Sequence, residues 1–285
     1  MTIKELYRSF LLQLEDIYEK NEAANICSIL FEGIAGITRS VLIKNPDQSL
    51  NEPTLLKLQE CLEELMREKP IQYITGEAWF YKMKLKVSPA VLIPRPETEE
   101  LVDVVIKYLK DKDSSIILDI GTGSGCIPIA VKKNIPAAII TSIDISIDAL
   151  AIAKENSMLQ KTSIDFQQLD FLDEKTWTLF PLFDVIVSNP PYIPENEKQL
   201  LDKNVTAYEP HTALFVANET PLIFYEKIAA FGKTHLKKHG KIFMETHEAF
   251  AINVAELFKD ASYSAEIIND LNGKQRMVVA THHCL

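Results

Sequence analysis

The feature that most constrains the fold is a rhythm that begins near residue 97, where helical patterns alternate with short apolar runs rich in β-branched residues. Strands that are connected through helices run parallel, so this rhythm predicts an α/β domain with a parallel sheet covered by helices on both faces. A helix over 99–110 is expected to open the domain. The strands are expected at 116–120, 138–143, 164–169, 184–188 and 241–245.

The last two β-like runs are connected differently. They cover 264–268 and 276–280 and are separated by a short link with the sequence Asn-Asp-Leu-Asn-Gly. A link too short for a crossover helix joins only antiparallel neighbours. The mostly parallel sheet is therefore expected to end in an antiparallel hairpin.

Residues 1–72 follow another pattern, in which apolar side chains recur every three or four positions. This spacing places them on one side of a helix and predicts a small bundle of amphipathic helices. Helices are expected over 3–17, 26–37 and 55–66, and Pro70 ends the last of them. Such a bundle is either a stabilising domain or a platform for a protein partner, and the spacing alone does not separate the two.

The segment 73–96 is predicted to connect the two regions as a β-hairpin. Apolar and polar residues alternate strictly over 80–87, and 91–93 is the expected partner strand. The exposed face of the first strand would carry Lys82, Lys84 and Lys86. Because lysines on an edge strand discourage edge pairing, we interpret them as a solvated face rather than as a binding surface.

Charge and cysteine content disfavour several classes of protein. Among 285 residues, 40 acidic side chains outnumber 30 basic ones, and the net charge of −10 disfavours a protein held mainly by nucleic-acid phosphates. No uncharged run approaches the roughly 18 residues of a membrane span, and there is no cleavable apolar leader. The cysteines at 27, 61, 126 and 284 show no disulfide or zinc spacing. A reduced, cytoplasmic setting without membrane contact is expected.

Histidines do not indicate a metal site. His235 and His239 are four residues apart and are expected near the C-terminal end of one helix, where cationic side chains suit the helix dipole. His282, His283 and Cys284 form a cluster at the chain terminus and imply no distant ligand. We therefore predict that no metal is bound.

A glycine-rich turn follows the first predicted strand. It contains Gly121, Thr122, Gly123, Ser124 and Gly125. Glycines let a ligand approach the backbone, and ligands of open α/β sheets bind beyond the carboxyl ends of the strands. The next strand ends at Asp144, whose carboxylate can accept hydrogen bonds from both ribose hydroxyls of an adenosyl ligand, because Ser146 is available to cap the following helix. The spacing differs from the Gly-x-Gly-x-x-Gly of dinucleotide sites, which favours S-adenosylmethionine over NAD.

The tetrapeptide Asn189-Pro190-Pro191-Tyr192 follows the predicted strand 184–188. The prolines stiffen this loop and remove backbone donors, which leaves its carbonyl groups to accept hydrogen bonds. Asn189 Oδ1 and the Pro190 carbonyl can accept both hydrogens of an –NH₂ group, while the Tyr192 ring covers the planar group that carries it. This geometry directs the nitrogen lone pair toward an incoming methyl group. We predict catalysis by orientation of that nitrogen, without an obligatory base.

Taken together, these motifs resemble the class I S-adenosylmethionine-dependent methyltransferases that act on exocyclic or amide nitrogen. Three further segments narrow the resemblance: 70–76 (Pro-Ile-Gln-Tyr-Ile-Thr-Gly), 91–99 (Val-Leu-Ile-Pro-Arg-Pro-Glu-Thr-Glu) and 208–214 (Tyr-Glu-Pro-His-Thr-Ala-Leu). They are similar to the HemK/PrmC family, the protein-(glutamine-N5) methyltransferases of peptide-chain release factors. The resemblance implies a Rossmann-like sheet of seven strands, S-adenosylmethionine as cofactor, and the glutamine of the Gly-Gly-Gln loop as substrate, in support of translation termination.

The resemblance also implies a role for each region. Residues 1–72 would recognise the release factor, 73–96 would form the connector, and 97–285 would be the methyltransferase domain. The cofactor would be bound by Gly121, Thr122, Gly123, Ser124, Gly125, Asp144, Phe171 and Asn189. The substrate glutamine would be bound by Asn189, Pro190, Pro191 and Tyr192, with Asn189, Pro190 and Tyr192 catalytic. Arg95 and Thr98 would close over the cofactor carboxylate.

Two segments depart from the family pattern, and two other functions compete with the one it implies. Residues 244–249 replace a Glu-Ile-Gly-like turn, and 216–221 replace a glycine-rich stretch. The runner-up is an adenine-N6 methyltransferase of nucleic acid, because the same loop would serve an exocyclic amine, although the chain has no basic stripe. An adaptor that binds S-adenosylmethionine without turnover would require a damaged motif, and neither motif is damaged.

Overall fold

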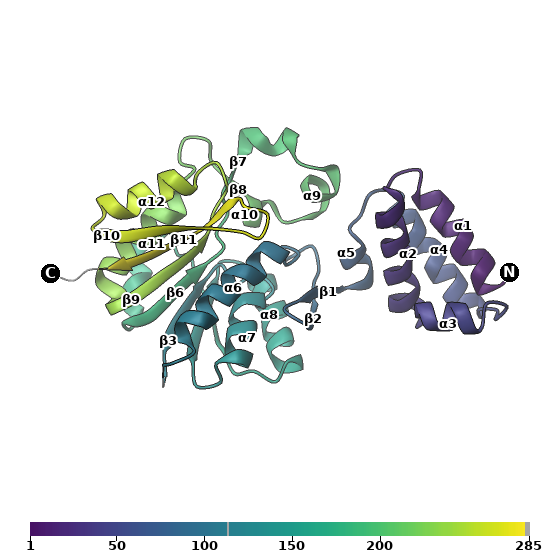
Figure 1. The fold of residues 1–285 in the computed structure, drawn as a ribbon, viewed down its shortest axis with the longest axis horizontal. Coiled ribbons are helices and arrows are strands. Elements are labelled where there is room, and N and C mark those ends of the chain that lie inside the picture. Colours follow the sequence, from purple (N-terminus) through teal and green to yellow (C-terminus); the bar gives the residue numbers. More distant parts are fainter. Residues whose placement is uncertain (113, 283–285) are drawn as a thin grey trace. The chain divides into compact units, whose positions relative to one another are not determined.

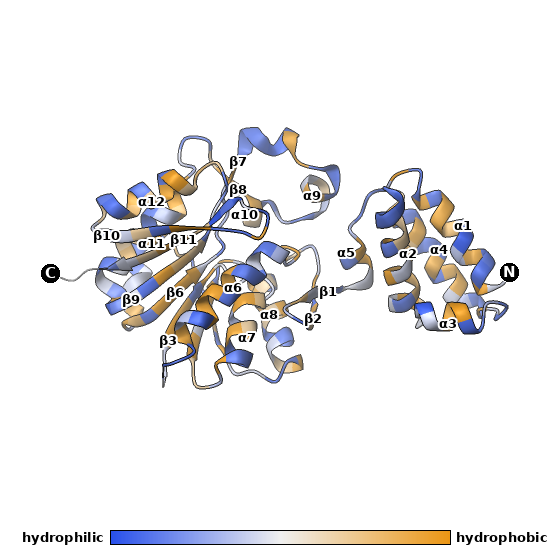
Figure 2. Cartoon of the chain, viewed as in Figure 1, coloured by the Kyte–Doolittle hydropathy of each residue, from blue (hydrophilic) through white to orange (hydrophobic). Residues whose placement is uncertain are grey.

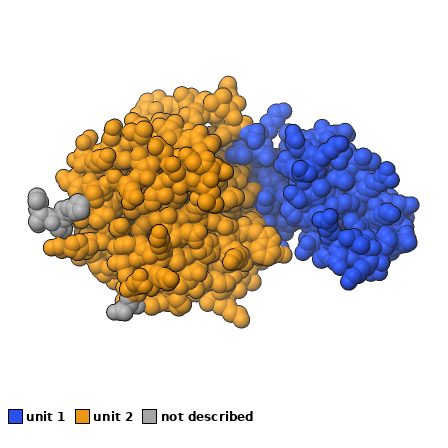
Figure 3. Space-filling view, viewed as in Figure 1, with its two compact units in different colours: residues 1–77, 202–208 blue, residues 78–201, 209–285 orange. Residues whose placement is uncertain are grey.

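The computed structural model describes residues 1–112 and 114–282 (Figure 1). The chain divides into two compact units, which Figure 3 shows in different colours. One unit consists of Met1–Glu77 and Asp202–Tyr208, and the other consists of Ala78–Leu201 and Glu209–Leu285. Over the described residues, no helix combines the length and apolar character that crossing a membrane requires.

The first unit is helical. Its helices are α1 (Ile3–Leu14), α2 (Lys20–Ala35), α3 (Arg39–Lys44), α4 (Glu52–Leu65), α5 (Ile71–Thr75) and α9 (Lys203–Tyr208). Figure 2 shows apolar and polar sides on α1, α2 and α4, and the apolar sides meet in one buried core. The predicted helical region is confirmed, but α2 covers 20–35 rather than 26–37. Buried Ala23 extends its apolar stripe, and Gly36, with a φ of 66°, ends the helix.

The second unit is built on a seven-stranded sheet in the order β10-β11-β9-β6-β3-β4-β5. Its strands are β3 (Ile116–Ile120), β4 (Ile139–Asp144), β5 (Asp165–Gln168), β6 (Phe183–Ser188), β9 (Leu236–Glu245), β10 (Tyr263–Asn269) and β11 (Gln275–His282). The first five run parallel, and β11 pairs antiparallel with both β9 and β10. The predicted α/β fold with a terminal antiparallel hairpin is therefore confirmed.

Helices cover both faces of this sheet. Successive residues of a strand point to opposite faces, so the sheet packs against helices on both sides. The helices of this unit are α6 (Pro96–Leu109), α7 (Cys126–Asn134), α8 (Ile147–Leu159), α11 (Ile223–His235) and α12 (Ala251–Asp260), together with the short α10 (His211–Leu214) next to β8. On β3, Ile117 packs in the core with α6 and α7, whereas its neighbour Leu118 packs in the core with α11 and α12. The short elements are η1 (Glu174–Leu179), β7 (Ile193–Pro194), η2 (Glu195–Leu200) and β8 (Phe215–Val216).

The connector differs from the prediction. The hairpin consists of β1 (Glu77–Phe80) and β2 (Met83–Lys86), joined by Tyr81 and Lys82, whose φ angles are 49° and 62°. Two positive φ angles are typical of the two-residue turns that match the twist of a hairpin. The expectation of one strand over 80–87 that pairs with 91–93 is therefore wrong, because the chain turns back at 81–82. Lys82 lies in this turn, and only Lys84 and Lys86 share the exposed strand face.

β9 also begins earlier than predicted, and this changes the place of two histidines. α11 ends at His235, and His239 lies in β9 with a φ of 64°. The register between β6 and β9 shifts between Phe183 and Val185, so β9 starts irregularly. The expectation that both histidines lie on one helix is wrong.

Candidate functional site

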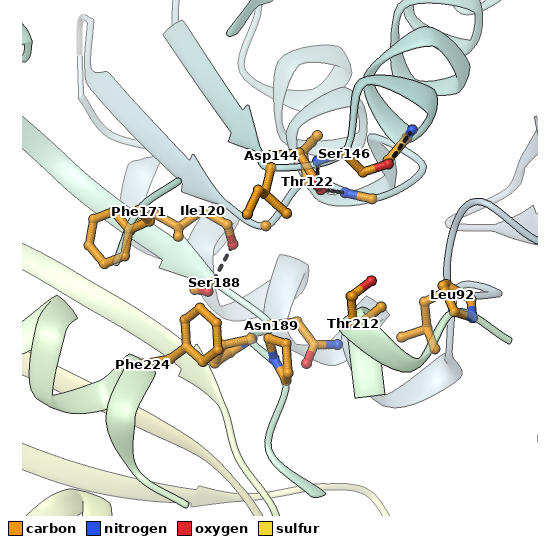
Figure 4. Close-up of a pocket in the computed structure, with 18 of the residues that line it drawn as sticks. Leu92, Ile120, Thr122, Asp144, Ser146, Phe171, Ser188, Asn189, Thr212 and Phe224 are labelled. Carbon is orange, nitrogen blue, oxygen red and sulfur yellow. Dashed lines mark hydrogen bonds between the residues drawn. The ribbon is translucent and has the colours of Figure 1, made fainter. Parts of the chain in front are cut away.

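A cavity of about 510 Å³ lies beyond the carboxyl ends of β3, β4 and β6 (Figure 4). Of the predicted site residues, it is lined by Gly121, Thr122, Gly123, Ser124, Asp144, Phe171, Asn189, Pro190 and Pro191, together with Arg95 and Thr98. The ends of adjacent parallel strands share one edge of the sheet, which is why motifs far apart in sequence meet here. Gly125 and Tyr192 are the two predicted residues that do not line the cavity.

Backbone hydrogen bonds define the turn of the glycine loop. The amides of Gly121 and Thr122 both donate to the Ile143 carbonyl, at 2.9 and 3.0 Å, and the Gly125 amide donates to the Thr122 carbonyl at 2.9 Å. The φ angles of Gly121, Gly123 and Gly125 are 75°, 54° and 79°, in the left-handed region that favours glycine. Gly125 is the N-cap of α7 and faces Ala153 rather than the cavity.

Asp144 holds the glycine loop against the start of α8. Its Oδ2 accepts a hydrogen bond from the Gly123 amide and its Oδ1 accepts one from the Ser146 amide, both at 2.9 Å. The Ser146 hydroxyl caps α8 by accepting from the Ala149 amide at 3.1 Å, as expected. A carboxylate has about four acceptor positions, so each oxygen of half-buried Asp144 retains a lone pair for a ligand on the cavity side.

Several buried polar groups near the glycine loop lack a partner. The carboxylate of Asp119 is fully buried, and neither oxygen has a hydrogen bond of normal geometry. Burial raises the pKa of Asp119 to about 7, although the nearby hydroxyls of Thr122 and Ser142 lower it. Thr122 and Ser124 line the cavity, but their hydroxyl oxygens are buried and have no hydrogen bond of normal geometry. These groups lie together beneath the glycine loop, where the raised pKa of Asp119 reflects the cost of burying a charge.

Side chains from two distant elements hold the Asn-Pro-Pro-Tyr loop. Asn189 Nδ2 donates to Thr98 Oγ1 on α6 at 3.1 Å, and the Thr98 hydroxyl donates to Glu245 Oε2 at 2.6 Å. At the other end of the loop, the Tyr192 hydroxyl donates to Glu245 Oε1 at 3.3 Å. Glu245 is the last residue of β9, the neighbour of β6 in the sheet. Glu245 was not among the predicted site residues, although it ends the predicted strand 241–245.

Arg95 forms an ion pair with Glu209. Its Nη2 lies 2.5 Å from Oε1 of buried Glu209, whose Oε2 accepts from the Ile93 amide at 3.2 Å. Glu209 therefore holds the segment 93–95 in place beside the cavity. Glu209 lies in the Tyr-Glu-Pro-His motif, but nothing in that motif indicates that its carboxylate pairs with Arg95. The assignment of Arg95 and Thr98 to the cofactor carboxylate stays a prediction.

An aromatic group closes another side of the cavity. Phe171 is buried and stacks on Trp177 with ring centroids 5.6 Å apart. The Trp177 indole donates to the Phe171 carbonyl at 2.9 Å, which fixes the loop after β5. Figure 4 shows Phe171 and Asn189 on different sides of the cavity, with Asp144 on the side of the glycine loop. The cavity thus offers a polar rim and an apolar wall, which fit the sugar and the base of an adenosyl group.

The described residues include no cluster of three or more histidine, cysteine or acidic side chains that could hold a metal ion. His235 stacks on Phe231 with ring centroids 4.2 Å apart. His283 and Cys284 of the predicted terminal cluster lie outside the described residues.

Comparisons with known proteins agree with this arrangement. The family described as "Methyltransferase small domain" matches residues 99–244, and the "PrmC N-terminal domain" matches residues 5–76. The chain is 39% identical to the release factor glutamine methyltransferase of Flavobacterium psychrophilum over 98% of both chains. It is 37% identical to the protein of the same name from Bacteroides thetaiotaomicron, over 94% of this chain and 95% of that one.

Among solved structures, the 16S rRNA N2 G1207 methyltransferase of T. thermophilus, in complex with AdoMet and guanosine, has a similar fold. The TM-score is 0.51 at 14% identity, and the match covers 73% of this chain and 50% of that one. This likeness extends to the fold alone. The relatives match the chain over nearly its full length, in the helical unit and in the catalytic unit. The chain therefore belongs to the release factor glutamine methyltransferase family.

Proposed function

We propose that this protein transfers a methyl group from S-adenosylmethionine to the side-chain amide nitrogen, N5, of the glutamine in the Gly-Gly-Gln loop of peptide-chain release factors. The observation that carries this proposal is that the glycine loop with Asp144 and the Asn-Pro-Pro-Tyr loop face one cavity. Relatives that share almost the whole chain carry the name release factor glutamine methyltransferase. A methyl donor on one side and an oriented nitrogen on the other are the two requirements of this reaction.

The cofactor would lie along the glycine loop. Asp144 has free acceptor positions for the two ribose hydroxyls. Phe171 would form the apolar wall beside the adenine. When bound, S-adenosylmethionine supplies an electrophilic methyl group on its sulfonium centre.

The substrate would be oriented by Asn189 and Pro190. An amide nitrogen is a poor nucleophile, because its lone pair is delocalised into the carbonyl group. Asn189 Nδ2 donates to Thr98, which leaves Oδ1 to accept one N–H of the glutamine, while the Pro190 carbonyl accepts the other. These bonds hold the nitrogen with its lone pair toward the methyl group, and positioning alone lowers such barriers by several kcal/mol. The excess proton leaves after transfer, so no strong base is required.

The regions of the chain would divide the work. Residues 1–72 would bind a surface of the release factor, 73–96 would connect, and 97–285 would carry out the transfer. A folded protein substrate offers far more surface than free glutamine, and a second binding region adds affinity without touching the chemistry. We also propose a cytoplasmic setting, because Cys27, Cys61 and Cys126 are free thiols.

The test is to incubate the full-length protein with labelled S-adenosylmethionine and four substrates under the same conditions. These are an intact release factor, the same factor with Gln→Ala in its Gly-Gly-Gln loop, a DNA duplex and free glutamine. Mass spectrometry should find one methyl group on the loop glutamine of the intact factor only. Labelling of DNA, or equal labelling of the Gln→Ala factor, would contradict the proposal.

A further inference from the structure

A buried carboxylate bridges the two ends of the Asn-Pro-Pro-Tyr loop. Glu245 is 2% exposed and receives a hydrogen bond from Thr98 on one oxygen and from Tyr192 on the other. Thr98, also 2% exposed, links the same carboxylate to Asn189. One acidic side chain therefore contacts the loop directly at Tyr192 and through one hydroxyl at Asn189.

The direction of these hydrogen bonds decides which way the Asn189 amide points. An ionised carboxylate only accepts, so the single proton of the Thr98 hydroxyl is directed to Glu245. The Thr98 oxygen can then only accept from Asn189, and it selects Nδ2, the donor end of the amide. Oδ1 must point the other way, which leaves it available to accept a substrate N–H at the cavity.

We propose that Glu245 is a positioning residue, which acts through Thr98 to fix the orientation of the Asn189 amide and which anchors Tyr192 at the other end of the loop. The link to turnover rests on the proposed function. The effect on the orientation of Asn189 does not rest on it, because the chain of hydrogen bonds lies wholly within this protein.

Burial makes this device sensitive to pH. It raises the pKa of Glu245 to about 7, and the hydrogen bonds from Thr98 and Tyr192 lower it. The other titratable or charged groups that interact with this carboxylate are Glu97 on α6, which raises its pKa, Arg276 on β11, which lowers it, Cys126 on α7 and Tyr225 on α11. A protonated Glu245 can donate to Thr98, whose own proton is then free to turn toward Asn189 and to favour the reversed amide. Turnover is therefore expected to fall as the pH drops through about 7.

Three substitutions test the chain of hydrogen bonds with the full-length enzyme and a release factor. Thr98→Val removes the hydroxyl with little change of shape and should lower kcat about tenfold or more, with a smaller effect on KM. Thr98→Ser keeps the hydroxyl and should restore most of the rate. Glu245→Gln resembles the protonated acid, because it adds a donor, and should give a low kcat without the loss between pH 8 and 6.

Tyr225→Phe is the matched control. The Tyr225 hydroxyl donates to the backbone carbonyl of Glu245 at 3.0 Å, so this variant removes a buried hydrogen bond to the same residue and keeps both hydrogen bonds of its carboxylate. If the effect of Thr98→Val came from a general disturbance of the packing around β9, Tyr225→Phe would lower kcat as much as Thr98→Val does. We expect its kcat and its pH profile to stay within about twofold of the unmodified enzyme.

A second readout does not need turnover. The side-chain amide signals of Asn189 in ¹⁵N-labelled enzyme, assigned by their loss in Asn189→Ala, should shift with a midpoint near pH 7. The shift should vanish in Glu245→Gln and in Thr98→Val. An unshifted signal in the unmodified enzyme, or a native kcat and pH profile in a folded Thr98→Val, would overturn the inference. If the enzyme fails to methylate release factors while the signal shifts as expected, the proposed function is wrong and the positioning role stands.

Discussion

The two loops that face the cavity are held in different ways. The glycine loop is held by backbone hydrogen bonds to Ile143 and by left-handed glycines, with Asp144 accepting from its Gly123 amide. In the Asn-Pro-Pro-Tyr loop, the polar side chains at both ends bond to other elements: Asn189 to Thr98 on α6, and Tyr192 to Glu245 on β9. The first loop is held mainly by backbone groups of its own and of the next strand, with one further hydrogen bond from Asn156 of α8 to the Ser124 carbonyl at 2.9 Å. The second is held by side chains of α6 and β9.

This difference separates the two tasks of the site. The shape of the glycine loop follows from the φ angles that glycine permits, and this shape is what we propose the cofactor binds. We propose that the Asn-Pro-Pro-Tyr loop orients one nitrogen, which requires its side-chain amide to adopt one of two possible orientations. Only the hydrogen-bond partners of that amide select between them. Damage to the first loop should weaken ligand binding or folding, and damage to the second should lower turnover.

The largest effect is expected from Asn189→Ala. The substitution removes the oriented acceptor without creating a buried charge, so kcat should fall about 10²-fold or more while the fold and the affinity for S-adenosylmethionine are retained. Initial rates with a release factor and calorimetry with the cofactor measure the two quantities separately. Turnover near the native level in a folded variant would remove this loop from the mechanism.

Asp144→Ala tests the ligand side of the glycine loop. The change removes charge-assisted acceptors for the ribose hydroxyls, so the affinity for S-adenosylmethionine should fall by roughly 1.5–3 kcal/mol. Asp144→Asn keeps one acceptor oxygen and should lose less. Calorimetry decides the matter, and an unchanged Kd for the alanine variant, or tight binding of NAD by the native protein, would refute the assignment.

Two alanine substitutions test whether the glycine loop depends on its own backbone. Both Gly123 and Gly125 have positive φ angles, so alanine at either position costs about 1 kcal/mol in backbone strain. A Cβ on Gly125 would also lie 3.2 Å from the Ala153 Cβ, whereas one on Gly123 would meet open space. In urea unfolding, we expect Gly125→Ala to destabilise by about 2 kcal/mol and Gly123→Ala by about half as much. Equal losses would mean that packing against α8 contributes nothing.

The smallest effect concerns Asp119, the buried acid below the glycine loop. Its pKa is raised to about 7 in the folded protein, so the folded state holds the proton more tightly than the unfolded state does. The contribution of Asp119 to stability is therefore present at low pH and is lost as the pH rises toward 7. Asp119→Asn should gain about 1 kcal/mol at pH 8 relative to the native protein, and no advantage near pH 4. A gain that is equal at both pH values would contradict the raised pKa.

Local patterns predicted most of the fold. The apolar run at 116–120 has the bounds of β3, and a short link near the C-terminus predicted the antiparallel pair β10 and β11. The incorrect predictions concern segments whose local sequence pattern fits two different secondary structures. The alternation over 80–87 fits one strand or a strand that turns at 81–82, and only the left-handed backbone of those two residues selects the hairpin.

The candidate site was predictable where its chemistry follows from a motif. The glycine loop, Asp144 and the tetrapeptide were found from residue types and from their place after strands, because the carboxyl ends of parallel strands meet at one edge. Glu245 and Glu209 were missed, because nothing near them in sequence shows that one holds Asn189 through Thr98 and that the other holds Arg95.

By itself, the sequence determined the helical region, the order of strands and helices, and the backbone of the glycine loop, because periodicity and φ preferences act over a few residues. The tertiary structure alone decided that Asp202–Tyr208 joins the helical unit, where the Tyr208 hydroxyl donates to the Arg67 carbonyl at 2.8 Å. It also decided the orientation of Asn189, whose partner is 91 positions away. Hydrogen bonds between such distant residues depend on how the elements pack, and no local pattern encodes that packing.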